Sequence, residues 1–340
     1  MNWACLDDRT ALTPRDGALS CPSCKRDYDV VQGVPVFTRN DRERAEVERQ
    51  PPLYEELWQS MQTRSAVEAA TAFCERHDRV RSPYSPDRKC FLAAPTEGTA
   101  VELGAGFGDD SVALAGSTAR TISIVPNLTN AWIVGKHVRE RVGTDWPVAV
   151  LRGVSRLPLA DSSVRTVAME DAAAAGFELS DASFSAAATE WNRILTPGGV
   201  VLLGLTNGIH RLPGLRHRAG PESLNRLVKR SAADGRGRLG VARTIRTMAG
   251  LGFEAPVVYA PLPNENDARV VLPADDSRVV QYLLSHLIRR NSRAVRLAIG
   301  AAQGLVALGL FRYLAPYYYL LFRKPDRTGV FSRSSLEGTD

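Results

Sequence analysis

The stretch that decides the fold is Thr99-Ala-Val-Glu-Leu-Gly-Ala-Gly-Phe-Gly108. Its first half is a short apolar run with one acid, Glu102, and such a run is typical of a buried parallel strand. Its second half has glycine at every second position, at Gly104, Gly106 and Gly108, where the backbone can turn tightly and a ligand can approach it closely. Two aspartates and an apolar run follow, as at the start of a helix. A strand, a glycine turn and a helix predict the nucleotide-binding start of a doubly wound sheet.

The chain after this stretch alternates between strand and helix patterns. The expected strands are 120–125, 147–151, 164–169 and 200–205, and the expected helices are 128–142 and 182–195. A further helix over 241–251 leads into a strand at 257–259, and the expected last strand is 317–322. Strands that alternate with helices in this way predict a mostly parallel sheet.

Three motifs resemble those of the class I S-adenosylmethionine-dependent methyltransferases. The spacing acid-x-Gly-x-Gly-x-Gly at 102–108 resembles motif I of that family and differs from the Gly-x-Gly-x-x-Gly fingerprint of dinucleotide-binding proteins. Leu157-Pro158 before Asp161 resembles the turn after the family's third strand, and Thr196-Pro-Gly-Gly199 resembles the entry to its fifth strand. The resemblance implies an α/β fold with a doubly wound, mostly parallel seven-stranded sheet and S-adenosylmethionine as the cofactor.

The resemblance also implies a set of cofactor contacts in and near the glycine loop. Glu102 would lie close to the methionine end of the cofactor. Glu170, at the end of the fourth strand, is a further candidate contact. The loop itself contributes Gly104, Ala105, Gly106 and Gly108.

The family usually has an acid at the end of the second strand, where it binds the two ribose hydroxyls, and this chain lacks it. No Asp or Glu lies between Asp110 and Glu140, so Ser123 and Asn127 are the candidate acceptors. A neutral acceptor contributes about 0.5–1.5 kcal/mol, against about 1.5–3 kcal/mol for a charged one. The acid after the third strand is also replaced, by a Gly-Val pair at 153–154. Two hypotheses stay open: the chain binds S-adenosylmethionine in a modified way, or it keeps the fold without the chemistry.

Polar residues follow the fourth and fifth strands, at Glu170, Asp171, Asn207 and His210. Open α/β sheets bind ligands at the carboxyl ends of their strands, so these groups would face a substrate. Removal of a proton from a hydroxyl or amine needs a general base, and Asp171 and His210 are the candidate catalytic residues. The alternative is that these side chains are loop groups that face water.

The first 38 residues predict a small unit of their own. Cys21-Pro-Ser-Cys24 has the spacing of a zinc knuckle, and Cys5 lies far enough upstream to supply the other half of a ribbon. Two short strands around Gln32-Gly33 follow. The unit resembles the zinc ribbon of many bacterial methyltransferases, which is related to the small activator subunit of tRNA and protein methyltransferases. In that family each half supplies Cys-x-x-Cys, and here Asp8 stands where the second cysteine is expected. The resemblance implies zinc at Cys5, Asp8, Cys21 and Cys24, and a ribbon without metal is the alternative.

These patterns divide the chain into five parts. They are a zinc-ribbon-like module (1–38), a linker and helical cap (39–95), a methyltransferase core (96–260), a helical insertion (261–314), and a last strand and tail (315–340). In the family that the core resembles, helices before the sheet often cover the cofactor pocket, which is the expected role of the cap.

The net charge of +6 is unevenly distributed. From Thr206 onward 21 Lys and Arg stand against 10 Asp and Glu, whereas the preceding part has 22 against 27. A basic C-terminal part is typical of proteins with an anionic partner such as RNA, acidic lipid or a phosphorylated substrate, although a solvated arginine-rich surface gives the same count. The uncharged run 297–311 is shorter than the ~20 residues that span a bilayer. It predicts either a helix within 286–313 that lies on an anionic membrane surface or a buried helix.

The sequence therefore predicts a methyltransferase that acts on an oxygen or nitrogen of a polar acceptor. Segments 259–263, 270–273 and 313–316 resemble tails of methyltransferases in bacterial surface-polysaccharide and glycolipid pathways, which implies a glycan or lipid-linked sugar. The alternatives are an RNA methyltransferase and a non-catalytic scaffold or binding protein that keeps the fold. No apolar leader is present and the cysteine count is odd, so we expect a cytoplasmic protein, with a peripheral site at the inner membrane face if the basic segment binds lipid.

Overall fold

The computed structural model describes residues 3–49, 52–77, 97–116, 120–171, 181–206, 240–262, 270–274, 276–286, 300, 303–304, 306–307 and 317–326. His210, Asn207 and most of the predicted membrane-surface segment 286–313 lie outside these residues. Among the helices that are described, none combines the length and the hydrophobicity needed to cross a bilayer.

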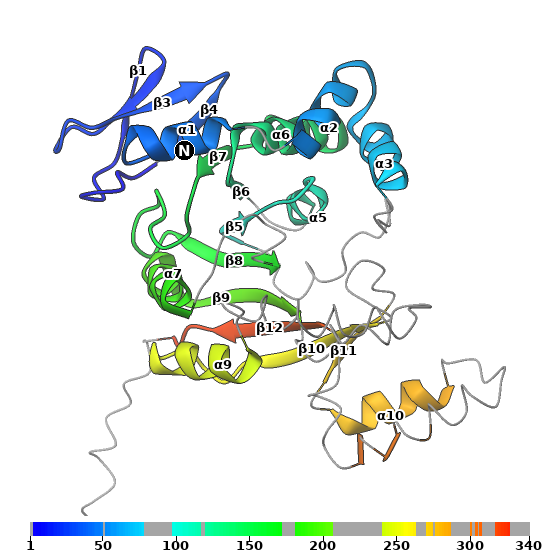
Figure 1. Cartoon of the computed structure of the whole chain (residues 1–340). Coiled ribbons are helices and arrows are strands. Elements are labelled where there is room, and N and C mark those ends of the chain that lie inside the picture. The colour runs from blue at the N-terminus through cyan, green and yellow to red at the C-terminus, as the bar shows by residue number, and fades with distance from the viewer. Residues whose placement is uncertain are drawn as a thin grey trace, which may run out of the picture.

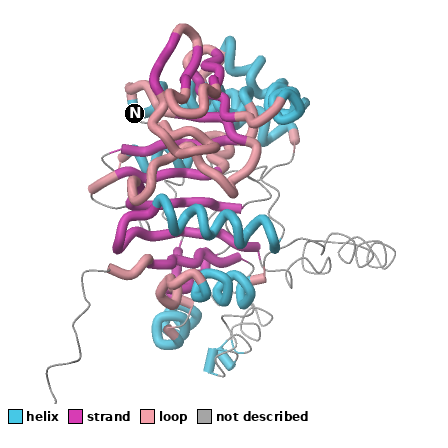
Figure 2. Tube along the Cα trace, turned by 90° about the vertical axis from the view of Figure 1, so that its left-hand side faces the viewer, coloured by secondary structure: helices cyan, strands magenta, loops and turns pink. Residues whose placement is uncertain are grey.

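One sheet runs through the described chain, in the strand order β1-β2-β3-β4-β7-β6-β5-β8-β9-β12-β10-β11 (Figures 1 and 2). Its central strands are parallel: β5 (Thr99–Leu103), β6 (Arg120–Val125), β7 (Val148–Leu151), β8 (Val164–Asp171) and β9 (Leu195–Thr206). β12 (Tyr317–Arg323) is antiparallel to β9 and to β10 (Val257–Leu262), between which it lies. The seven strands from β7 to β10 confirm the expected doubly wound sheet. Its order reverses at β5, which has β6 on one side and β8 on the other.

Helices cover both faces of this sheet (Figure 1). α5 (Asp109–Ala115) and α6 (Leu128–Val142) lie on one face, and α7 (Asp181–Ile194) and α9 (Val241–Gly250) lie on the other. Successive strand residues point to opposite faces, so Leu103 packs in the core cluster that contains Trp191 of α7, whereas Glu102 faces Ser111 of α5. α2 (Pro52–Thr63) and α3 (Ala66–Arg76), in the segment predicted as a helical cap, pack on the outside of α6.

The segment 39–95, predicted as a linker and helical cap, begins with a helix, α1 (Asp41–Glu48), that the sequence analysis did not single out. The Asn40 side chain caps its first turn by accepting from the Glu43 N–H at 2.9 Å. Arg42 and Arg44 pair with acids four residues further along the helix. Only Val47 is buried, so the charged run carries no apolar stripe from which the helix could be predicted.

The predicted helical insertion also differs from the expectation. It contains a strand, β11 (Val270–Pro273), which pairs antiparallel with β10, and a helix, α10 (Ser277–His286). The Pro-Gly-Gly turn predicted before the fifth strand lies inside β9 as a bulge. Leu195 pairs with Val164 and Val200 with Thr166, so four β9 residues stand opposite a single β8 residue.

The N-terminal ribbon continues the central sheet. It consists of β1 (Thr13–Arg15), β2 (Ala18–Ser20), β3 (Asp27–Val31) and β4 (Val34–Phe37), with the predicted turn at 32–33. β4 pairs in parallel with β7, Val36 beside Val150 and Phe37 beside Leu151. The fully buried Phe37 ring packs against Trp3 and Tyr28 at centroid distances of 5.4 and 5.1 Å. The ribbon thus shares one sheet and one apolar core with the central strands.

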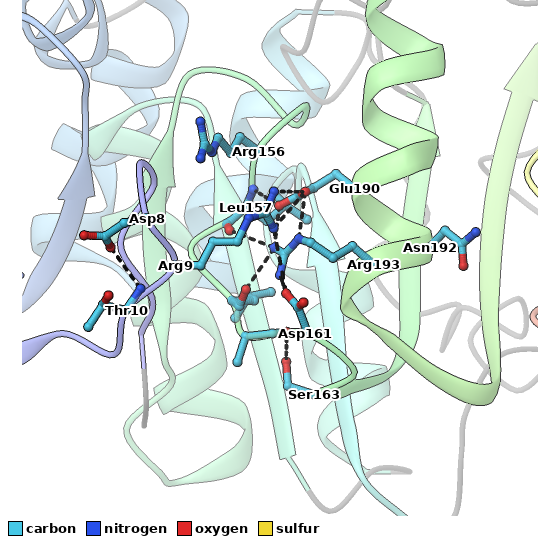
Figure 3. A network of polar contacts seen from close by, with 12 residues as sticks. Asp8, Arg9, Thr10, Arg156, Leu157, Asp161, Ser163, Glu190, Asn192 and Arg193 are labelled. Carbon is cyan, nitrogen blue, oxygen red and sulfur yellow. Dashed lines mark hydrogen bonds and ion pairs between the residues drawn. The ribbon is translucent and has the colours of Figure 1, made fainter. Parts of the chain in front are cut away.

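A buried acid on α7 joins the ribbon to the core (Figure 3). Glu190 is 4% exposed and accepts from the Leu157 N–H at 2.7 Å and from Arg193 at 2.5 Å. Arg9 of the ribbon reaches the same carboxylate at 3.4 Å. Burial raises the pKa of Glu190, whereas the Leu157 N–H and Arg9 oppose this rise. On the ribbon side, the Ala4 N–H donates to the Pro158 carbonyl at 3.0 Å, so the Leu-Pro turn contacts both α7 and the ribbon.

Replacement of this acid is expected to destabilise the whole chain. Glu190→Ala should lower the free energy of unfolding by about 3–5 kcal/mol, because the buried Leu157 N–H would lose its acceptor and Arg193 would lose the more deeply buried of its two acids. Urea unfolding followed by fluorescence and circular dichroism measures the change. Asp161→Ala is the matched control, since this more exposed acid also pairs with Arg193, and it should cost no more than about 1 kcal/mol. Equal effects of the two substitutions would contradict the role assigned to Glu190.

Candidate functional site

The glycine loop that follows β5 has a backbone that only glycine adopts readily. The φ angles of Gly104, Gly106 and Gly108 are +77°, +50° and +92°. The Gly104 N–H donates to the Ile124 carbonyl at 2.8 Å, which ties the loop to β6. A Cβ on Gly108 would lie 3.4 Å from the Val134 Cα, whereas one on Gly106 would meet no atom of the described residues within 4 Å. Gly108 therefore permits the close packing of α6, and Gly106 leaves the backbone open to a ligand.

The loop lies where an open α/β sheet binds ligands. It follows the carboxyl end of β5, at the point where the strand order reverses. Ala105 is buried against the start of α6, in the cluster that contains Leu128 and Ala131. Glu170 and Asp171 end the neighbouring strand β8, so the structure brings their backbone to the same edge of the sheet as the loop.

Below the loop, Glu102 belongs to a buried polar network. Its carboxylate is 4% exposed and accepts from the hydroxyls of Ser111 and Ser123, the latter at 3.1 Å. The two hydroxyls are 2.9 Å apart, and the Trp146 Nε1–H donates to Ser123 at 2.9 Å. Ser123, predicted from the sequence as a ribose acceptor, has no exposed surface, and its hydroxyl is engaged by three groups of the chain.

Asn127, the other predicted acceptor, is the N-cap of α6. Its Oδ1 accepts from the Asn130 N–H at 2.8 Å, and the residue is 7% exposed. This oxygen already stabilises the first turn of the helix. Both neutral acceptors that the sequence offered thus have partners within the chain.

His137 is a residue of the site that the sequence analysis did not single out. It lies on α6, is 3% exposed, and its Nδ1 is 2.8 Å from the Phe107 carbonyl in the glycine loop. The carboxylate of Asp109 lies 3.8 Å from the same nitrogen. Because a carbonyl only accepts, Nδ1 carries the proton and donates. The sequence signal that could have identified His137 is its position among the apolar residues of the predicted helix 128–142.

The cap contacts the same loop residue from the other side. The Phe107 ring packs against Tyr54 of α2 and Phe73 of α3, at centroid distances of 6.2 and 5.8 Å. Phe107 is thus held by α6 through its carbonyl and by the cap through its ring. The cap helices therefore contact the glycine loop.

The ribbon brings together the four residues predicted to bind metal. One ligand atom from each of Cys5, Asp8, Cys21 and Cys24 lies within 4.8 Å of the other three. The Cys5 and Cys24 sulfurs are 3.5 Å apart, and Cys21 Sγ is 3.3 Å from Asp8 Oδ2. A tetrahedral zinc ion with bonds of about 2.3 Å to sulfur and 2.0 Å to oxygen separates its ligands by roughly 3.5–3.8 Å. The cluster has the size and the donor atoms that zinc requires.

The two halves of the cluster have the same backbone conformation. In the first half the Arg9 N–H donates to the Cys5 carbonyl at 3.0 Å, and in the second the Lys25 N–H donates to the Cys21 carbonyl at 3.1 Å. The φ angles of Arg9 and Lys25 are +65° and +63°. Asp8 therefore occupies the position in the first knuckle that Cys24 occupies in the second.

Hydrogen bonds in the cluster favour the anionic forms that metal ligands need. The Thr10 N–H holds the pKa of Asp8 well below its usual range. Burial works against ionisation of Cys5, but hydrogen bonds from the Tyr28 hydroxyl and from backbone N–H groups lower the pKa of its thiol. The Arg26 N–H favours the Cys24 thiolate, but burial and the two nearby cysteines raise its pKa to about 11. A bound cation would relieve this repulsion.

Substitution of His137 is expected to loosen the glycine loop. His137→Leu removes the donor to the Phe107 carbonyl, so amide hydrogen exchange in 104–108 should become faster. His137→Asn places its amide nitrogen where Nδ1 lies and should restore slow exchange. Exchange detected by mass spectrometry on the ligand-free protein measures both. Equal exchange in the leucine variant and the unchanged protein would contradict the assignment.

Substitution of Asp8 tests the metal cluster. Asp8→Cys completes four thiolates on an unchanged backbone and should bind zinc more tightly than the unchanged protein. Asp8→Ala should bind it at least about tenfold more weakly, which corresponds to ~1.4 kcal/mol. Competition with a chromophoric chelator gives the affinities. Cys74→Ala, which removes a buried thiol of α3, is the control. An alanine variant with unchanged zinc affinity would exclude Asp8 as a ligand.

Comparison with known proteins finds similarity to solved structures only. No protein-family profile and no curated protein sequence matches it. A chain of the complex between the Haloferax volcanii Trm112 methyltransferase activator and its proposed methyltransferase matches 82% of this chain over 100% of its own length at 16% identity, with a TM-score of 0.45. Geranyl diphosphate C-methyltransferase from Streptomyces coelicolor A3(2) matches 84% and 96% at 13% identity, with a TM-score of 0.43. The fold itself follows from the strand order: seven strands, the last antiparallel and inserted between the fifth and the sixth, form the class I S-adenosylmethionine-dependent methyltransferase fold.

Proposed function

We propose that this protein transfers the methyl group of S-adenosylmethionine to an oxygen or nitrogen of a polar acceptor. The observation that carries the proposal is the glycine loop at the carboxyl edge of the sheet, where none of the described residues lies within 4 Å of a Cβ added to Gly106. The motif resemblance supports a nucleoside cofactor there. A glycan or lipid-linked sugar is the acceptor that the C-terminal segments favour.

The residues of the site fit this cofactor. The cofactor supplies an electrophilic methyl group on its sulfonium, and the chain supplies position and proton transfer. The loop, held by Ile124, His137 and the cap, presents its backbone to the nucleoside. Asp171, at the end of β8, is the proposed general base for a hydroxyl or amine acceptor, with His210 as the second candidate. Glu102 supports the loop from below through Ser111, at the start of α5.

We also propose that Cys5, Asp8, Cys21 and Cys24 hold a structural zinc ion. Matching knuckle backbones and a closed set of four ligands support this role. The ion would fix Arg9, which directly follows Asp8 and contacts Glu190 of the core. Zinc would then stabilise the joint between ribbon and core.

Calorimetric titration with S-adenosylmethionine and S-adenosylhomocysteine tests the proposed activity. The unchanged protein should bind both, and Gly106→Val should bind at least about tenfold more weakly, because a branched side chain is strained at φ +50° and occupies the open approach. Gly135→Ala, on α6 with no atom within 4 Å of an added Cβ, is the control and should bind normally. Absence of heat and of a thermal shift at millimolar cofactor would favour the non-catalytic scaffold.

A further inference from the structure

Asn130, in the first turn of α6, has a buried side chain whose carbonyl oxygen has no partner. The residue is 1% exposed, and its Oδ1 makes no hydrogen bond within the part of the chain that the structure describes. Its backbone N–H is paired, with the Asn127 cap. Buried polar groups are almost always paired, so an unpaired one indicates a group that the protein alone does not provide.

The side chain lies on the face of α6 that meets the glycine loop. Asn130, Val134 and His137 follow one another at spacings of four and three residues, so they share one side of the helix. Val134 packs against the Gly108 position, and His137 donates to the Phe107 carbonyl. Asn130 is one turn closer to the amino end of α6, which is the end at the carboxyl edge of the sheet.

Two other unpaired buried polar atoms of α6 lie on sides of the helix that do not face the glycine loop. Thr129 and Trp132 also have an unpaired oxygen or nitrogen, but they are one position before and two positions after Asn130 and project from other sides of the helix. The Trp132 ring packs against Trp58 of the cap at a centroid distance of 5.7 Å. Of these three residues, only Asn130 lies on the side of α6 that carries Val134 and His137.

The neighbouring candidates leave the ribose without an acceptor. Ser123 is enclosed in the Glu102 network, and Asn127 caps the helix. No acid lies between Asp110 and Glu140. A ribose presents two adjacent hydroxyls, each a donor and an acceptor, and a carboxamide offers one acceptor oxygen and two N–H donors.

We propose that Asn130 binds the ribose hydroxyls of the cofactor, and so replaces from the helix the acid that the strand end lacks. This inference rests on the proposed function, since it names a contact of the same site. The carboxamide satisfies its buried oxygen with a hydroxyl donor, and its N–H groups donate to the second hydroxyl. The positive end of α6 lies beside these contacts.

The experiment compares S-adenosylhomocysteine with its 2′-deoxy analogue by calorimetry. The unchanged protein should lose about 3- to 10-fold in affinity for the deoxy analogue. Asn130→Ala should bind S-adenosylhomocysteine more weakly by a similar factor and should discriminate less than about twofold between the two ligands. Asn130→Asp, which has the same shape, should discriminate more strongly than the unchanged protein, because a carboxylate accepts more strongly than an amide.

Asn192→Ala is the matched control. Its Nδ2 donates to the Leu251 carbonyl at 2.8 Å on the opposite face of the sheet, so its loss should lower the melting temperature and leave the discrimination unchanged. If the alanine variant of Asn130 fails to fold, the aspartate variant carries the test. An unchanged affinity ratio in the folded variants overturns the inference while the proposed function stands. Failure of the unchanged protein to bind S-adenosylhomocysteine overturns both.

Discussion

Positive φ angles at three alternate residues are the constraint on which the candidate site depends. An L-residue with a side chain pays roughly 1–2 kcal/mol for this conformation, so the loop exists only because Gly104, Gly106 and Gly108 supply it. Such a flexible sequence needs external support to keep one shape. β6 provides it through Ile124, α6 through His137, and the cap through the ring of Phe107. The loop thus takes its shape from its neighbours as much as from its own sequence.

The central fold could be predicted because its signals are local. The helix 128–142 and the strand 120–125 have the predicted bounds, since a capping asparagine, a terminal glycine and β-branched runs mark them in the sequence. The pairing of β4 with β7 could not be predicted in the same way, because the two strands are far apart in the sequence. A parallel pair forms where both faces of the sheet become buried, and no local sequence signal marks that partner. α1 was missed because its stability comes from a cap and ion pairs rather than from an apolar stripe.

The site was predictable in its residues more than in its contacts. Knuckle spacing indicated Cys21 and Cys24 as metal ligands, with Cys5 as a third, and the family resemblance added Asp8. Glycine spacing indicated the loop. Spacing could not show that Ser123 would be enclosed or that Asn127 would cap a helix, because the partner of a hydroxyl or an amide is fixed only by packing. His137 and Asn130 gave weak signals for the same reason. Each is one of several polar residues on α6, and the sequence does not show which side of the helix will face the loop.

The ribbon covers the edge that the parallel strands would otherwise leave open beside β7. The described sheet then ends in two short strands, β1 with three residues and β11 with four, the latter closing on a proline. Short edge strands, one of which ends on a proline, pair poorly with a strand of another molecule, and this limits self-association. Because the covering strand belongs to the same polypeptide, its local concentration does not depend on expression of a second gene product. Each core is accompanied by one ribbon, a one-to-one stoichiometry set by translation.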